Sequence, residues 1–319
     1  MADPAPKSGP PAPSPPGPGP ASTPEALGRA LAGASYLAND RLALTAWLAL
    51  ALDKPLLVEG PAGVGKTDLA RALAEALGRE RLRLQCYEGL DESKALYEWD
   101  YAKQILFTQL LQGTLAARTA GASTVAEALD RLEGEASAFF GPRFLLARPL
   151  LAALTAEAPV VLLIDEVDRA DPEFEAFLLE LLGEKQVTIP ELGTVRAKHS
   201  PLVVLTTNGT RDMTDALRRR CLHAFVDYPT PSREVAILEL RVPGIGRALA
   251  EKLATVAAAV RAMDLRKAPS ISESVDWARA LVLLGKNALD ADTARETLGL
   301  LLKYEEDRAR VEGKLDALL

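Results

Sequence analysis

The sequence predicts an α/β fold, in which a doubly wound parallel sheet is followed by a C-terminal helical domain. Three features of the 319 residues predict it. Short apolar stretches such as residues 160–164 alternate with helical segments up to residue 230, which is typical of a parallel sheet covered by helices. A glycine-rich turn at 60–67 joins one such stretch to a helix. From Pro231 onward no strand pattern remains, and the apolar residues follow helical spacing.

The elements of the first half follow from the same periodicity. Residues 40–52 are apolar throughout, which predicts a buried helix, and residues 56–59 form a short apolar strand. Apolar residues share one helical face over 66–77, and Gly78 is a typical helix end. Apolar side chains alternate over 81–86, which predicts a strand.

Later segments continue the alternation. Residues 104–157 are predicted to be mostly helical, and Asp171-Pro172 is a good start for a helix that ends at Gly183. Further strands are predicted at 186–189 and 194–196, as a hairpin, and at 202–206 and 224–227. Helices are predicted at 232–241, 246–263, 271–285 and 291–317. We therefore expect an α/β domain over 25–230 and a helical domain over 231–319.

The composition limits the class of protein. Ten of the 22 prolines fall within residues 1–24, which predicts a disordered, proline-rich tail. The formal charge of −7 argues against broad nucleic-acid affinity. Two cysteines and two histidines exclude a disulfide framework and disfavour a zinc site. No apolar run reaches the length of a membrane span, and no signal peptide is apparent, so we expect a cytoplasmic protein.

The turn at 60–67 has the sequence GPAGVGKT, which fits the phosphate-binding pattern GxxxxGKS/T between a strand and a helix. Backbone N–H groups in such a loop surround phosphates, and the helix N-terminus adds a positive dipole end. Lys66 is expected to reach the β- and γ-phosphates, and the Thr67 hydroxyl to ligate Mg²⁺. The residues expected to bind the nucleotide are Gly60, Pro61, Ala62, Gly63, Val64, Gly65, Lys66, Thr67 and Asp68.

Two acidic residues follow the apolar strand at 160–164. Asp165 is expected to hold the Mg²⁺ shell, and Glu166 to polarise the attacking water. Asn208 ends another apolar strand, where its amide would orient that water, although an isolated asparagine is more often a turn former. Gln85, at the end of the strand over 81–86, could restrain Glu166, or could simply be solvated.

The combination of GPAGVGKT, VVLLIDE, TTN and ALRRRC, followed by a helical lid, resembles AAA+ ATPases and, within them, the MoxR family. The match covers roughly residues 30–300. The segments LQCYEGLD (84–91) and LYEWDY (96–101), with the AGVGKT loop, are similar to the branch that includes CoxD, a maturation factor for molybdenum carbon monoxide dehydrogenase.

This resemblance implies a ring-forming, usually hexameric ATPase that uses ATP and Mg²⁺. It implies an insertion at 87–105 and a hairpin at 186–197, and a partner with a von Willebrand factor A domain beside a protein client. Tyr97, Trp99 and Tyr101 would contact that client, or would equally well cover the domain's own apolar surface. By analogy with the ALLSRC pattern of related ATPases, Arg220 is the first candidate for an arginine finger, before Arg219 and Arg218.

The chain departs from the family at the lid. Such lids offer an arginine to the γ-phosphate at the start of a helix, but residues 268–273 contain none. Arg266 and Lys267 precede this stretch, and Arg279 follows it. A DNA-directed AAA+ motor or loader is the main alternative function, because the ATPase core alone does not select a client. An ATP-binding scaffold without turnover is disfavoured, because Glu166 and Asn208 are both present.

Overall fold

The computed structural model describes residues 19–113, 124, 142–189 and 193–319. The described residues fall into two compact units. One contains residues 19–78, 206–209 and 222–319, and the other contains residues within 79–205 and 210–221. The helical C-terminal region therefore groups with the first strand and the glycine-rich loop. The boundary predicted between 230 and 231 remains a prediction.

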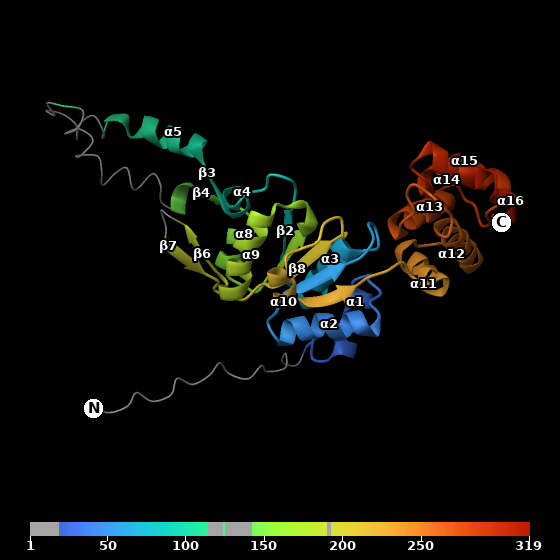
Figure 1. Ribbon diagram of the computed structural model, residues 1–319, viewed down its shortest axis with the longest axis horizontal. Helices are drawn as coiled ribbons and strands as arrows, with labels where there is room; N and C mark the ends of the chain where they lie inside the picture. Colours follow the sequence, from blue (N-terminus) through green and yellow to red (C-terminus); the bar gives the residue numbers. More distant parts are fainter. Residues whose placement is uncertain (1–18, 114–123, 125–141, 190–192) are drawn as a thin grey trace. The chain divides into compact units, whose positions relative to one another are not determined.

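A five-stranded sheet has the strand order β2-β5-β8-β1-β9 (Figure 1). Strand β2 pairs with β5, β5 with β8, and β1 with β9, and each of these pairs is parallel. The strands are β1 (Leu56–Glu59), β2 (Arg81–Gln85), β5 (Val161–Asp165), β8 (Leu202–Thr207) and β9 (Leu222–Phe225). All residues of β5 and β8 are buried, which explains the apolar runs 161–164 and 202–205 within them. The predicted parallel α/β sheet is confirmed.

Helices from both units pack on these strands. Helices α1 and α2 pack together, α2 packs on β1 and β9, and α8 packs on β2 and β5. The helices that flank the sheet strands are α1 (Pro24–Gly33), α2 (Asp40–Ala51), α3 (Lys66–Leu77), α8 (Pro149–Thr155), α9 (Pro172–Glu184) and α10 (Asp215–Arg220).

Two antiparallel strand pairs lie outside the main sheet. The first joins β3 (Tyr97–Trp99) to β4 (Leu145–Ala147) and is accompanied by α4 (Glu92–Leu96) and α5 (Tyr101–Leu110). The second joins β6 (Gln186–Ile189) to β7 (Gly193–Arg196), which confirms the strands of the predicted hairpin. Its residues 190–192 lie outside the described part of the chain.

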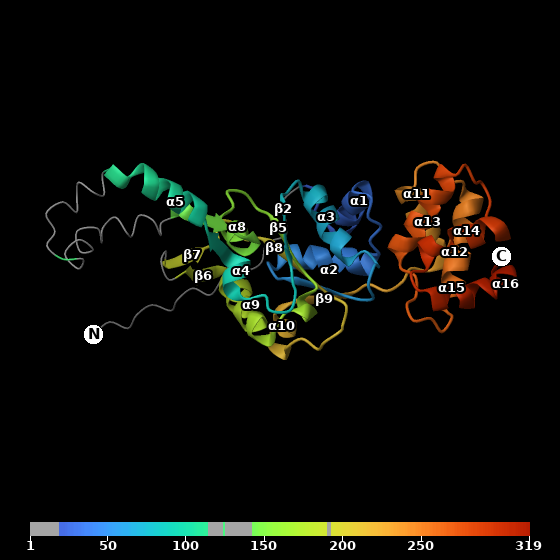
Figure 2. The same ribbon diagram turned by 90° about the horizontal axis from the view of Figure 1, so that it is seen from above.

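The C-terminal region is helical, as predicted, and has its own core. Figures 1 and 2 show α11–α16 gathered into one group. Trp277 is fully buried at its centre and donates from Nε1 to Thr297 Oγ1 at 2.8 Å. A buried ion pair joins Arg261 to Glu234. The helices are α11 (Pro231–Arg241), α12 (Arg247–Arg261), α13 (Ile271–Leu283), α14 (Ala291–Leu301), α15 (Glu305–Glu312) and α16 (Leu315–Leu318).

Three predicted boundaries were wrong. Residues 145–147 form strand β4 rather than helix, because they pair with β3. Strand β9 begins at Leu222, where parallel pairing with Leu56 begins, rather than at 224. The sequence predicted one helix over 291–317, whereas the structure has three helices there. The chain leaves the helical conformation after Leu301 and again after Glu312.

Most of the predicted tail, residues 1–18, lies outside the described part of the chain. Residues 19–23, which the sequence assigned to that tail, contact the folded body instead. Ala21 is buried, and its carbonyl oxygen accepts a hydrogen bond from Trp47 Nε1 of α2 at 2.9 Å. Among the described residues, no helix is long and apolar enough to cross a membrane.

Candidate functional site

The glycine-rich loop joins β1 to α3, as the sequence predicted. Gly60 is required by close approach, because a Cβ atom there would lie 1.9 Å from the carbonyl oxygen of Val226. Gly63 has a φ of +73°, and its Cβ would lie 2.3 Å from the Ser270 side chain. Gly65 precedes α3 at the capping position. Because glycine has no side chain, it provides no side-chain cap for the first N–H groups of the helix. This geometry suits an anion.

Lys66 is the first residue of α3 and is almost completely buried, with 6% of its surface exposed. Its Nζ donates to the carbonyl oxygens of Gly60 at 2.7 Å and Pro61 at 2.6 Å, and to Asn208 Oδ1 at 2.8 Å. The structure therefore brings together Lys66 and Asn208, which are 142 residues apart. An ammonium folded back into its own loop in this way can exchange these oxygens for phosphate oxygens.

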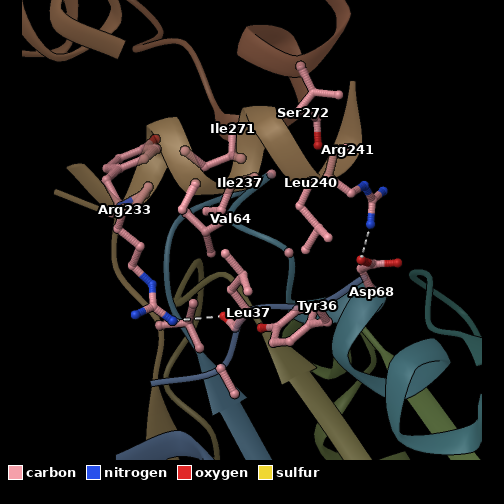
Figure 3. A pocket seen from close by; sticks show the side chains of 18 of the residues that line it. Tyr36, Leu37, Val64, Asp68, Arg233, Ile237, Leu240, Arg241, Ile271 and Ser272 are labelled. Carbon is pink, nitrogen blue, oxygen red and sulfur yellow. Dashed lines mark hydrogen bonds and ion pairs between the residues drawn. The ribbon is translucent and has the colours of Figure 1, made fainter. Parts of the chain in front are cut away.

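A pocket of about 970 Å³ opens beside the loop, within the same unit (Figure 3). This volume is at the upper end of the usual range for ligand sites. The lining combines apolar side chains with several charges, and includes Tyr36, Leu37, Val64, Asp68, Arg241 and Ile271. Tyr36 is 8% exposed, and burial together with the charge of Asp68 raises the pKa of its hydroxyl.

Asp68, predicted to bind the nucleotide, lies in the first turn of α3 and is bound by two guanidinium groups. Arg71 contacts it at 2.5 Å, and Arg241 of α11 contacts it at 2.8 Å, as the dashed line in Figure 3 shows. Burial alone would raise the pKa of this carboxyl group, but the two arginines outweigh burial and hold the pKa below its usual range. Asp68 is therefore a charged link between α3 and α11.

The two predicted acidic residues lie at the end of β5, in the other unit. Asp165 is 2% exposed, and its Oδ2 accepts a hydrogen bond from Arg83 Nη2 at 2.7 Å. Glu166 has a left-handed backbone, with a φ of +55°. Its Oε2 accepts from Gln85 Nε2 and from Arg169 Nη1, each at 3.1 Å. The contact expected between Gln85 and Glu166 is present.

Cys86 follows β2 and lies next to these acids. It is fully buried, and its N–H donates to the Asp165 carbonyl oxygen at 2.9 Å. Burial, followed by the charges of Asp165, Asp168 and Glu166, raises the pKa of its thiol to about 12. Because the thiolate is the nucleophilic form, this cysteine is chemically inert at neutral pH.

The three candidate arginines end α10. Arg219 and Arg220 are exposed, and Arg218 is half-buried. Arg220 Nη1 donates to the carbonyl oxygen of Leu179 in α9 and lies against Gly183. Arg220 can therefore reach beyond its own helix, and which of the three acts on a nucleotide remains a prediction.

Helix α13 begins at Ile271 with a capping box between Ser270 and Glu273. The backbone N–H groups of Arg266 and Lys267 bind the carboxylate of Asp307, and Lys267 Nζ lies 3.6 Å from Glu273 Oε1. The guanidinium of Arg266 also stacks on Tyr304, with 4.2 Å between its Cζ and the ring centroid. Arg279, two turns into α13, lines the pocket.

The family model described as AAA domain (dynein-related subfamily) matches residues 55–221, more than half of the chain. The chain belongs to this family. It is an AAA+ ATPase, and the family normally uses ATP with Mg²⁺. The matched residues run from the start of β1 to the cysteine after α10, and so include the loop, both acids, Asn208 and Arg220.

The chain is also similar to named chaperones. It is 28% identical over 184 residues to "Chaperone protein ClpB 2" of Thermosynechococcus vestitus, covering 55% of this chain and 17% of that protein. It is 26% identical over 256 residues to "Chaperone protein ClpB" of Corynebacterium glutamicum, covering 75% of this chain and 26% of that protein. The chain thus spans about a sixth to a quarter of the length of these relatives.

Solved structures of RuvB from Thermotoga maritima are distantly similar. One, titled a Holliday junction branch migration motor, is 18% identical, covers 85% of this chain and 74% of its own, and has a TM-score of 0.43. Another is 17% identical, covers 87% of this chain and 74% of its own, and has a TM-score of 0.45. A likeness this distant says nothing about function.

Several charged residues of the AAA domain site escaped the sequence analysis. Arg241 and Arg233 line the pocket, and Arg233 Nη2 donates to the Leu37 carbonyl oxygen at 2.8 Å. Arg83 and Arg169 bind the two acids. No local pattern marks these arginines, since each resembles an ordinary charge on a solvated helix or strand. Only their tertiary partners distinguish them.

Proposed function

We propose that this chain is a MoxR-type AAA+ ATPase that uses ATP hydrolysis to remodel or activate a protein client in the cytoplasm. We propose further that it works as a homo-oligomeric ring, beside a protein with a von Willebrand factor A domain. The resemblance of segments 84–91 and 96–101 to the CoxD branch supports this choice, as does the similarity to chaperones called ClpB.

The observation that carries the proposal is the environment of Lys66. A buried ammonium is stable only with several acceptors, and Lys66 has the oxygens of Gly60, Pro61 and Asn208. Phosphate oxygens would replace the two loop carbonyls, while the start of α3 offers its N–H groups to the same anion. The apolar part of the pocket beside the loop would then hold the base.

The residues also fit a magnesium ion. Thr67 and Asp165 supply oxygen ligands, which Mg²⁺ prefers. Within the described residues, no group of three or more His, Cys, Asp or Glu side chains could hold a metal ion. This suits an ion held mainly by phosphates and water, with one or two protein ligands. When bound, Mg²⁺ would neutralise charge on the phosphates during hydrolysis.

Glu166 would then act as the general base that receives a proton from the attacking water. Gln85 and Arg169 already hold its carboxylate, so in this state it is restrained rather than free to turn. Asn208, whose side-chain oxygen accepts from Lys66, would orient that water through its amide.

The experiment is Glu166→Gln, which preserves shape but removes the proton acceptor. ATP hydrolysis should fall by about 10²–10⁴-fold, while Mg²⁺-ATP binding, measured by calorimetry, should change little. Glu173→Gln, at an exposed position in α9, is the matched control and should behave as the wild type. If Glu166→Gln hydrolyses ATP at the wild-type rate, Glu166 is not the base.

The same variant tests the client. Because it should hold ATP without turnover, it should retain a bound protein that crosslinking and mass spectrometry can identify. The alternative, a DNA-directed motor, predicts instead that labelled duplex DNA binds with an affinity that falls steeply with salt on a log–log plot. DNA binding without a retained protein would overturn the client proposal.

A further inference from the structure

Arg83 lies on β2, two residues before Gln85 on the same face of the strand. Its Nη2 donates to Asp165 Oδ2 at 2.7 Å and to Gln85 Oε1 at 2.5 Å. Strand register explains this reach, since Gln85 pairs with Asp165 across the parallel strands. One guanidinium therefore bridges the strand that ends in Gln85 and the strand that ends in Asp165.

The bridge also sets the orientation of the Gln85 amide. Because its Oε1 faces Arg83, its Nε2 faces Glu166, to which it donates at 3.1 Å. Arg169, three residues after Glu166, donates to the same Oε2 atom of Glu166. Arg83 is thus connected directly to one acid and, through a single amide, to the other.

The two members of the Arg83–Asp165 pair differ in their access to solvent. The Asp165 side chain is 3% exposed, whereas the Arg83 side chain is 48% exposed. A buried carboxylate needs a cation, because leaving its charge uncompensated is costly. A long, half-exposed arginine can instead turn its charged group into water. In this pair Arg83 is the exchangeable partner and Asp165 the fixed one.

A metal ion and Arg83 would therefore compete for one carboxylate. We propose that Arg83 is a positioning residue that neutralises Asp165 when Mg²⁺ is absent, orients Gln85 against Glu166, and is displaced from Asp165 when the metal binds. This inference rests on the proposed function, because it takes Asp165 as the residue that holds the metal. It adds that Arg83 restrains Asp165 directly, and Glu166 through Gln85, as long as no metal ion is bound.

The test measures metal affinity rather than turnover. The melting temperature of the full chain is followed at saturating ADP while Mg²⁺ is titrated from an EDTA-treated sample. Arg83→Met keeps the length of the side chain and removes the competing charge. The Mg²⁺ concentration at half-maximal stabilisation should fall about fivefold or more, the low end of coupling between two ligands of linked sites. Without Mg²⁺, the variant should melt below the wild type.

Arg81→Met is the matched control. Arg81 lies on the same strand and face, and among the side-chain contacts that the structure describes it makes none to Asp165, Gln85 or Glu166. Its Mg²⁺ midpoint should equal that of the wild type. Arg83→Lys keeps a positive charge beside Asp165 without the fork that bridges to Gln85, so its midpoint should lie closer to the wild type than that of Arg83→Met.

The outcomes separate the two proposals. If ADP with Mg²⁺ stabilises the wild type and the midpoints of Arg83→Met and Arg81→Met coincide, Arg83 does not compete with the metal, and the inference is wrong while the proposed function stands. If Arg83→Met does not fold, Arg83→Gln, which also removes the charge, decides, and a midpoint equal to that of Arg81→Met overturns the inference. If Mg²⁺ and ADP do not stabilise the wild type at all, the proposed function fails, and the inference fails with it.

Discussion

Asp68 follows the two residues predicted to contact phosphate and metal, but its own charge is used within the protein. Its carboxylate joins Arg71 of the same helix to Arg241 of α11. Because two guanidinium groups share one partly buried carboxylate, the interaction exceeds an ordinary surface pair. The helix that follows the predicted phosphate-binding loop is thereby linked to α11 through one side chain.

Asp68→Asn should lower stability by about 1–3 kcal/mol at pH 7, since charge-assisted hydrogen bonds are lost. The folded-state pKa of Asp68 lies below its unfolded value, so the contribution is complete above the unfolded pKa of about 3.9. It is lost as pH falls through the folded pKa. Urea unfolding at several pH values should therefore show the variant and wild type converging below pH 4.

Asp292→Asn is the control for this effect. Asp292 also pairs with an arginine three residues away, Arg295, but its side chain is 92% exposed. An exposed pair contributes at most about 1 kcal/mol. If both variants lose the same stability with the same pH profile, the burial of Asp68 has no energetic role.

At the scale of elements, three aromatic residues of the insertion after β2 differ in their exposure. Tyr97 and Trp99 of β3 are half-buried and contact each other edge to face, with 5.7 Å between ring centroids. Tyr101, at the start of α5, is 61% exposed. The sequence analysis left contact with a client and coverage of the domain's own surface equally open for all three, and the structure favours different answers for them.

Trp99→Ala should therefore lower the free energy of unfolding by about 1–3 kcal/mol, since a partly buried aromatic is lost. Tyr101→Ala should change it by less than about 0.5 kcal/mol, as is usual for surface substitutions. Urea unfolding of both variants measures the difference. If Tyr101→Ala is as destabilising as Trp99→Ala, Tyr101 packs within the domain and is not a contact surface.

The two antiparallel strand pairs show what sequence periodicity can and cannot predict. The hairpin β6–β7 was predicted because alternation and a turn signal are local properties. Strand β4 was missed, because residues 145–147 are extended only through pairing with Tyr97–Trp99, almost fifty residues earlier. Long-range pairing overrides local helical preference, and a single sequence does not display it.

For the site, the motifs themselves were predictable. Lys66 and Asn208 meet because the loop after β1 leads to Lys66 and β8 ends next to Asn208, and both strands were identified from apolar runs. Arg83, Arg169 and Arg241 were not predictable, because their roles depend on which carboxylate lies within reach. The acidic residues can be predicted from their place after an apolar strand. The arginines that contact them can be identified only from the folded structure.

At the scale of the whole molecule, the proposed ring predicts that active sites are shared between neighbouring subunits. Arg220→Ala should lose about 10³–10⁵-fold in rate if Arg220 acts as a finger on the neighbour's nucleotide. Lys66→Ala should also be inactive, because it loses a phosphate contact. Randomly co-assembled mixtures of the two should recover about a quarter of the sites, those with an intact Lys66 beside an intact Arg220.

Hydrolysis is measured for each variant alone and for the mixture, together with ring size by analytical ultracentrifugation. Arg196→Ala, at an exposed position in the hairpin, is a control that should remain active alone. Rings that form from the mixture but show no recovery would contradict either the choice of Arg220 or the sharing of sites.

The backbone of Glu166 has a consequence for evolution. Its φ of +55° is a conformation that glycine and asparagine adopt readily and that costs other residues about 1 kcal/mol or more. Selection for stability alone would not favour a glutamate there, whereas the proposed role of Glu166 as general base would retain it. In lineages that abandon hydrolysis but preserve the fold, we expect this position to drift early to glycine or asparagine. The residue at position 166 would then distinguish a descendant that only binds nucleotide from one that still hydrolyses ATP.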